Sequence, residues 1–168
     1  HTSEDSISNT AYLEGNGNTV TYTVASVETT KTAADLQQQI NEAAATEDTA
    51  DDTIVLTENY NIDATVTIPT DSNITIVGMT ARSADGGAIL KGTVDGYMFS
   101  VPENAEFTLG ADVNCMVRSS RLIESYGVFN MNGAAVTGGV AGMKQGVVHI
   151  AGGKFNMNGG NISGAAIT

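Results

Sequence analysis

The feature that most constrains this chain is a five-residue sequence that occurs twice. Residues 129–133 read Phe-Asn-Met-Asn-Gly, and residues 155–159 repeat them letter for letter, 26 positions later. The block Val-Thr-Gly at 136–138 recurs at the same offset as Ile-Ser-Gly at 162–164. A third segment, residues 107–110, shows the same apolar-polar-apolar order 22 positions before the first copy. Self-similarity at this period indicates a repeat architecture.

Each repeat contains short β-type runs and turn residues, and no helical pattern. Runs of three to five apolar or β-branched residues, separated by Gly, Asn, Asp and Ser, continue through most of the chain. The runs before the repeats are residues 54–56, 66–68, 74–77, 88–90, 98–101 and 107–109. Strands this short rarely form a stable sandwich, but they suit a solenoid in which each strand stacks on its counterpart in the next coil. The sequence therefore predicts an all-β fold, a parallel β-helix.

Strand alternation assigns the repeated side chains to two faces. Phe129 and Met131 should point into the core, and Asn130 should point outward. Stacking coils at roughly 4.8 Å then places Phe155 beside Phe129 and Asn156 beside Asn130. We expect an aromatic stack inside the solenoid and a solvent-facing amide ladder outside it.

One segment, residues 32–44, has a helical pattern. Thr32 and Asp35 have the spacing of a capping box, and Leu36 and Ile40 lie on one apolar face together with nearby alanines. We expect this helix to cap the first coil. A strand predicted at residues 19–27, where Val and Tyr alternate with Thr, should cover the same end.

These elements define one structural unit. Residues 1–52 form the N-terminal strand and helical cap, and residues 53–168 form roughly five coils of about 22 to 26 residues each. No closing segment follows the Ile-Ser-Gly block. Because a solenoid normally needs a cap at each end, we expect a piece of a longer protein, or an open end that a neighbouring molecule covers by end-to-end association.

Composition excludes several partners. The formal net charge of -12 repels nucleic acid and anionic lipid headgroups. No apolar run approaches the roughly 20 residues of a membrane span, so we expect no membrane insertion. The single cysteine, Cys115, excludes an internal disulfide and is expected to fill the core.

The chain resembles the right-handed parallel β-helix domains of the pectin-lyase-like class, in particular those of bacterial cell-surface and secreted proteins. The resemblance covers residues 32–168. It rests on the repeated blocks described above and on residues 34–43, 52–57, 66–69 and 73–78. It implies an extracellular or bacterial cell-surface location. The class contains lyases, hydrolases and non-catalytic adhesins, so the resemblance leaves the activity open.

Two functional hypotheses remain. The first is a non-catalytic structural and adhesive surface domain that binds a glycan or a neighbouring or host protein. The second is the N-terminal part of a secreted carbohydrate-active lyase or glycoside hydrolase. Catalytic members need acidic and basic groups on one outer face, whereas this chain has only seven Lys and Arg residues and none of the expected motifs. We assign no catalytic residue.

The candidate ligand site comprises Arg118, Arg121 and Tyr126, which lie near one another in sequence. Arginine and an aromatic ring could hold a sugar through its face and hydroxyls, although a loop with an extended arginine explains the same residues. His149 lies in an apolar run and receives no chemical role. The acidic pair Asp51 and Asp52 lacks the spacing of a calcium loop. We therefore predict no metal site and no cofactor.

Overall fold

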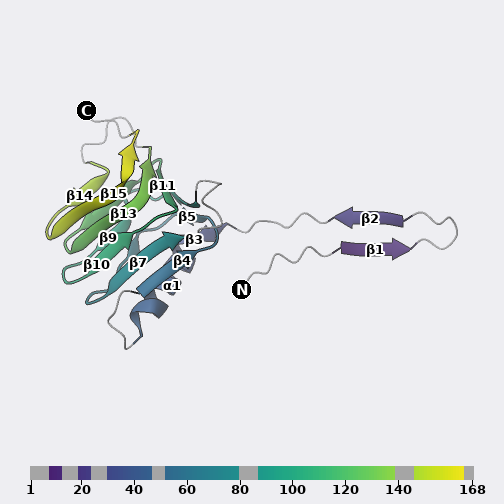
Figure 1. The fold of residues 1–168 in the computed structure, drawn as a ribbon, viewed down its shortest axis with the longest axis horizontal. Coiled ribbons are helices and arrows are strands. Elements are labelled where there is room, and N and C mark those ends of the chain that lie inside the picture. Colours follow the sequence, from purple (N-terminus) through teal and green to yellow (C-terminus); the bar gives the residue numbers. More distant parts are fainter. Residues whose placement is uncertain are drawn as a thin grey trace.

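The computed structural model describes residues 8–12, 19–23, 30–46, 52–79, 87–138 and 146–164. Within these residues the chain forms fifteen strands and one helix. Apart from one separate strand pair, the strands coil into a β-solenoid of about five turns (Figure 1). The colours in Figure 1 run from blue at the first coil to yellow at the last, so the coils stack in sequence order. The predicted all-β parallel solenoid is confirmed.

Parallel pairing between successive coils produces three long faces. Face 1 contains β4 (Asp52–Leu56), β7 (Asn73–Gly78), β10 (Glu106–Leu109) and the first halves of β13 (Val128–Thr137) and β15 (Lys154–Ser163). Face 2 contains β3 (Lys31–Thr32), β5 (Tyr60–Ile62), β8 (Ala88–Gly92), β11 (Val113–Val117) and the second halves of β13 and β15. Face 3 contains β6 (Val66–Thr67), β9 (Tyr97–Val101), β12 (Arg121–Ser125) and β14 (Val148–Ile150).

The register of face 1 places like side chains on like. Ile74 pairs with Phe107, Phe107 with Phe129, and Phe129 with Phe155. The ring centroids of Phe107 and Phe129 are 6.0 Å apart, and those of Phe129 and Phe155 are 5.2 Å apart with near-parallel planes. Phe99 of face 3 lies 4.9 Å from Phe107 and joins the stack to the opposite wall. The predicted aromatic column is therefore present and forms the centre of the core.

The coils are less uniform in length than expected. Phe107 follows its partner Ile74 by 33 positions, whereas the other steps along this column fall within the predicted 22 to 26. Most of the extra residues lie between β7 and β8, a connection that includes residues 80–86 outside the described part. A solenoid tolerates this variation because only the stacked strands must keep register.

The helix α1 (Ala33–Ala44) begins and packs as predicted. Asp35 closes the capping box, since its Oδ2 atom accepts bonds from the Thr32 backbone N–H at 2.7 Å and from the Thr32 hydroxyl at 3.0 Å. The backbone bond, followed by the hydroxyl bond, lowers the pKa of the Asp35 carboxyl. Leu36 and Ile40 are fully buried against the first coil, so the helix lies at the N-terminal end of the solenoid.

One glutamine of α1 substitutes for a missing strand. Strand β6 is the first strand of face 3, so one of its edges has no preceding strand to pair with. The Gln37 amide donates from Nε2 to the Thr67 carbonyl at 2.8 Å and accepts at Oε1 from the Thr67 N–H at 2.7 Å. The side-chain amide thus satisfies the same two backbone groups that a neighbouring strand would satisfy.

The described part of the predicted strand at residues 19–27 is a strand, and its partner is another N-terminal segment. Strand β2 (Thr19–Thr23) pairs antiparallel with β1 (Ser8–Tyr12) in a separate two-stranded sheet. The remaining predicted residues, 24–27, lie outside the described part. Strand β2 therefore finds its ladder partner in β1 and not in the first coil.

We predict that Phe129→Ala lowers the free energy of unfolding by about 3–5 kcal/mol, because it removes a fully buried ring between two stacked neighbours. Phe155→Ala, in the partly exposed last ring, should cost less. Urea unfolding followed by circular dichroism measures both. Equal losses in the two variants would contradict the central role of Phe129.

We also predict that Gln37→Ala destabilises the protein by about 0.5–1.5 kcal/mol, because the exposed Thr67 backbone groups exchange their two side-chain partners for water. Gln38→Ala is the matched control. Gln38 is its neighbour in α1 and bonds only to the exposed Glu42 side chain, so its loss should cost a few tenths of a kcal/mol. Hydrogen exchange of the Thr67 amide should accelerate in the first variant alone.

Candidate functional site

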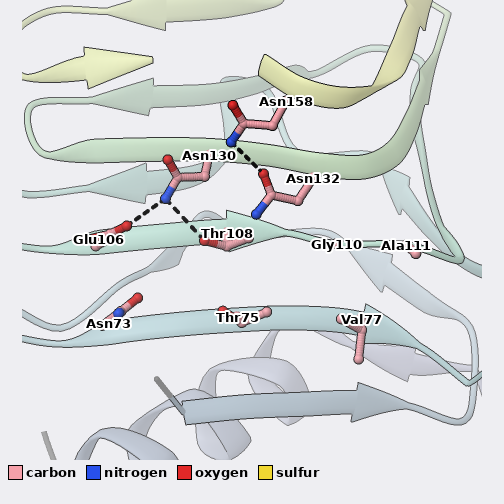
Figure 2. A pocket seen from close by; sticks show the side chains of 10 residues that line it. All are labelled: Asn73, Thr75, Val77, Glu106, Thr108, Gly110, Ala111, Asn130, Asn132 and Asn158. Atoms are coloured by element: carbon pink, nitrogen blue, oxygen red, sulfur yellow. Dashed lines mark hydrogen bonds between the residues drawn. The ribbon is translucent and has the colours of Figure 1, made fainter. Parts of the chain in front are cut away.

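The outer surface of face 1 carries an open groove of about 510 Å³. Its lining comes from β7, β10, β13 and β15, so it crosses four successive coils (Figure 2). The lining residues are Asn73, Thr75, Val77, Glu106, Thr108, Gly110, Ala111, Asn130, Asn132 and Asn158. We call this surface the face 1 groove. Its size falls within the range of about 300–1,000 Å³ that is usual for ligand sites.

Gly110 lets two coils pack closely at the downstream end of the groove. Leu109 is fully buried, so alternation directs the next position outward, toward the groove. A Cβ atom built at Gly110 would lie 2.6 Å from Cγ1 of Val77 on the preceding coil, which is closer than two side-chain carbons approach. Glycine therefore leaves the space that the Val77 side chain occupies.

A hydrogen-bonded ladder forms the centre of the groove. Asn156 Nδ2 donates to Asn130 Oδ1 at 2.7 Å, and Asn130 Nδ2 donates to Glu106 Oε1 at 2.6 Å and to Thr108 Oγ1 at 3.2 Å. The predicted amide pairing of Asn130 and Asn156 is therefore present. It is not solvent-facing at Asn130, which is only 8% exposed because the neighbouring coils flank it on both sides.

A second amide pair lies at the downstream end of the groove. Asn158 Nδ2 donates to Asn132 Oδ1 at 2.9 Å, and both side chains are exposed. This bond uses one donor of Asn158 and one acceptor of Asn132. The Nδ2 group of Asn132 thus keeps bonding capacity and points toward the β10 side of the groove, whereas the Oδ1 atom of Asn158 keeps bonding capacity at the outer margin (Figure 2). The repeated Asn-Met-Asn sequence indicates this pair, although we assigned no ligand to these asparagines from the sequence.

The groove lining carries little formal charge. Among its ten lining residues, Glu106 carries the one formal charge, and the other polar side chains are neutral amides and hydroxyls. Asn130 donates a short charge-assisted hydrogen bond to this carboxylate. The lining therefore presents donors and acceptors without a cation to attract an anionic ligand.

The three predicted ligand residues lie along face 3. Arg118 is exposed in the turn before β12, Arg121 is the first residue of β12, and Tyr126 directly follows its last residue. The five residues of β12 span about 17 Å, so the two arginines and Tyr126 lie at opposite ends of this strand. The structure thus brings Arg118 and Arg121 to one corner and leaves Tyr126 at the other. Their ligand-binding role remains a prediction.

Arg121 takes part in a polar cluster that sequence spacing could not reveal. Its guanidinium carbon lies 4.3 Å from the ring centroid of Tyr97, its partner in β9. The Tyr97 hydroxyl is 3.1 Å from Nδ1 of His149, and the same nitrogen is 3.2 Å from Oε1 of Glu124. Partial burial is the main factor that raises the pKa of Tyr97. His149, to which we assigned no role, therefore connects β14 to β9 and β12.

Tyr126 borders a second hollow of about 710 Å³ at the corner between faces 3 and 1. Its side chain is 44% exposed, and Asp71 and Glu103 contribute carboxylates to the same hollow. This hollow shares Asn73 and Glu106 with the face 1 groove. The two hollows therefore adjoin at the upstream end of the groove.

Cys115 fills the core as predicted. Its side chain is fully buried, and that burial raises the pKa of the thiol to about 12. The thiol is therefore protonated at neutral pH and shielded from reagents. Within the residues that the structure describes, no three His, Cys, Asp or Glu side chains gather as a metal site would require.

Comparison with known proteins adds no relative. No family model, no curated protein and no solved structure matches this chain. Within the described residues, the single helix is too short and polar to cross a bilayer.

We predict that Asn130→Ala destabilises the protein by about 1–3 kcal/mol, because Glu106 and Asn156 lose their shared partner in a nearly buried position. Asn132→Ala, in an exposed position of the same strand, should change stability by less than about 0.5 kcal/mol. Urea unfolding of both variants measures the difference. Equal stability of the two variants would contradict a structural role for the ladder.

Proposed function

We propose that this chain is a non-catalytic structural and adhesive domain of an exported bacterial surface protein. The observation that carries the proposal is the face 1 groove, in which coil stacking holds neutral amides and hydroxyls in fixed columns. Such a surface suits recognition of a ligand over several coils. The ligand is a glycan or a protein with an uncharged polar surface.

Fold and charge give independent support. The sequence resembles pectin-lyase-like β-helices of secreted and cell-surface proteins, a class in which non-catalytic adhesins occur. A solenoid is quasi-one-dimensional and presents an extended surface from a rigid scaffold. The net charge of -12 favours solubility and opposes contact with nucleic acid or anionic lipid. These properties suit a domain that displays binding surfaces outside the cell.

A second candidate is the N-terminal part of a carbohydrate-active lyase or hydrolase. The observation in its favour is the cluster on face 3, where Glu124, His149 and Tyr97 bring three titratable groups together. Such groups serve as general acids and bases in other enzymes. In this chain their bonds to one another connect three coils, which supports a structural role over a catalytic one.

The deciding experiment incubates the purified chain with arrayed polysaccharides and surface proteins, and measures retention and released sugar in the same wells. We expect retention without product. Arg118→Ala, Arg121→Ala and Tyr126→Ala then test whether face 3 contributes to the contact. Release of sugar above a heat-denatured control would reject the adhesive function in favour of the enzyme. In that case Glu124→Gln and His149→Ala should reduce the rate.

A further inference from the structure

The bonds within the face 1 groove leave a defined set of polar groups for a ligand. Among the described residues, Asn132 Nδ2 has no partner, and Asn158 Oδ1 accepts no bond. The Asn73 amide is likewise without a partner at the upstream end. Glu106 uses one oxygen for Asn130, and its second oxygen remains available. The groove thus offers both donors and acceptors, and sugar hydroxyls can bond to both.

These groups lie at the two ends of a surface that can hold more than one sugar ring. Register places Asn73 and Glu106 at the upstream ends of paired strands, and Gly110 four residues downstream of Glu106. That separation is about 13 Å along the strands, and the four strands β7, β10, β13 and β15 span about 14 Å across them. At the downstream end, Val77 and Ala111 add an apolar surface against which a ring can pack.

The downstream contacts are held in place before any ligand arrives. Asn158 and Asn132 fix each other through their mutual bond, and the strands beneath them are joined by the ladder at Asn130. A ligand therefore pays little conformational entropy to order them. This arrangement favours recognition by many weak bonds to a rigid surface.

Charge distinguishes between classes of sugar. A uronate or sulfated chain in this groove would place its anions beside Glu106, and no lining residue supplies a cation. The net charge of -12 adds long-range repulsion. An uncharged sugar avoids both effects and can still donate hydroxyl bonds to the carboxylate.

We infer that the face 1 groove binds an uncharged oligosaccharide, which contacts the amides of Asn132 and Asn158 at one end and Asn73 and Glu106 at the other. This inference rests on the proposed adhesive function and specifies its ligand class and its site. It places the contact on face 1, away from Arg118 and Arg121.

The test titrates the full chain by isothermal calorimetry with tetrasaccharides of glucose, mannose and galactose, and with the uronate form of each. We expect at least one neutral tetrasaccharide to bind, with little salt dependence, and more tightly than its uronate. Asn132→Ala with Asn158→Ala should weaken binding about tenfold, which matches the loss of two modest hydrogen bonds. Asn161→Ala is the control, since Asn161 is an exposed asparagine of β15 on face 2.

Three outcomes would overturn the inference. They are preferential binding of a uronate, binding that depends on Arg118, Arg121 or Tyr126 but not on the groove asparagines, and no binding of any neutral tetrasaccharide at millimolar concentration. In each case, retention of another glycan or a protein in the array would leave the adhesive function standing. Sugar release in the calorimeter samples, detected by chromatography, would instead reject that function. Unchanged circular dichroism of the variants confirms that they remain folded.

Discussion

Parallel hydrogen bonding between successive coils is the constraint on which the rest of this structure depends. It fixes the distance from each strand to its counterpart, and it therefore stacks corresponding side chains directly on one another. Inside the solenoid this produces the Phe107, Phe129 and Phe155 column. Outside it, the same register brings Asn156 to Asn130. One backbone arrangement thus builds the core and the candidate binding surface together.

Much of the fold could be predicted because the sequence contains an exact repeat, which indicates stacked coils. Identical residues at a fixed offset occupy equivalent positions in successive coils, and parallel pairing then places Phe155 beside Phe129. The 33-residue step from Ile74 to Phe107 could not be predicted, because that coil shares no sequence with its neighbours and only its strands obey the ladder. The N-terminal strand pair was missed for a related reason, since alternation identifies a strand but not its partner.

The site was less predictable than the fold. Glycine is needed at position 110 only because the register sets this position beside Val77 of the preceding coil. Similarly, Arg121 meets Tyr97 across coils, 24 positions apart in a stretch without recognisable repeats. Sequence proximity instead suggested Tyr126, which the length of β12 keeps at the far end of the strand. Binding residues on a solenoid are neighbours across coils, and linear spacing does not show them.

The pairing of β13 with β15, which keeps a 26-residue offset except for a local irregularity at Asn132, also bears on how such a protein changes over generations. Two adjacent copies of nearly the same segment, 26 residues apart, are substrates for unequal recombination in the gene. A crossover between them would add or delete one whole coil while every column, inside and outside, continued unbroken. The number of coils would then vary between descendants more readily than the width or the surface chemistry of the solenoid, so a longer solenoid would keep the face 1 groove.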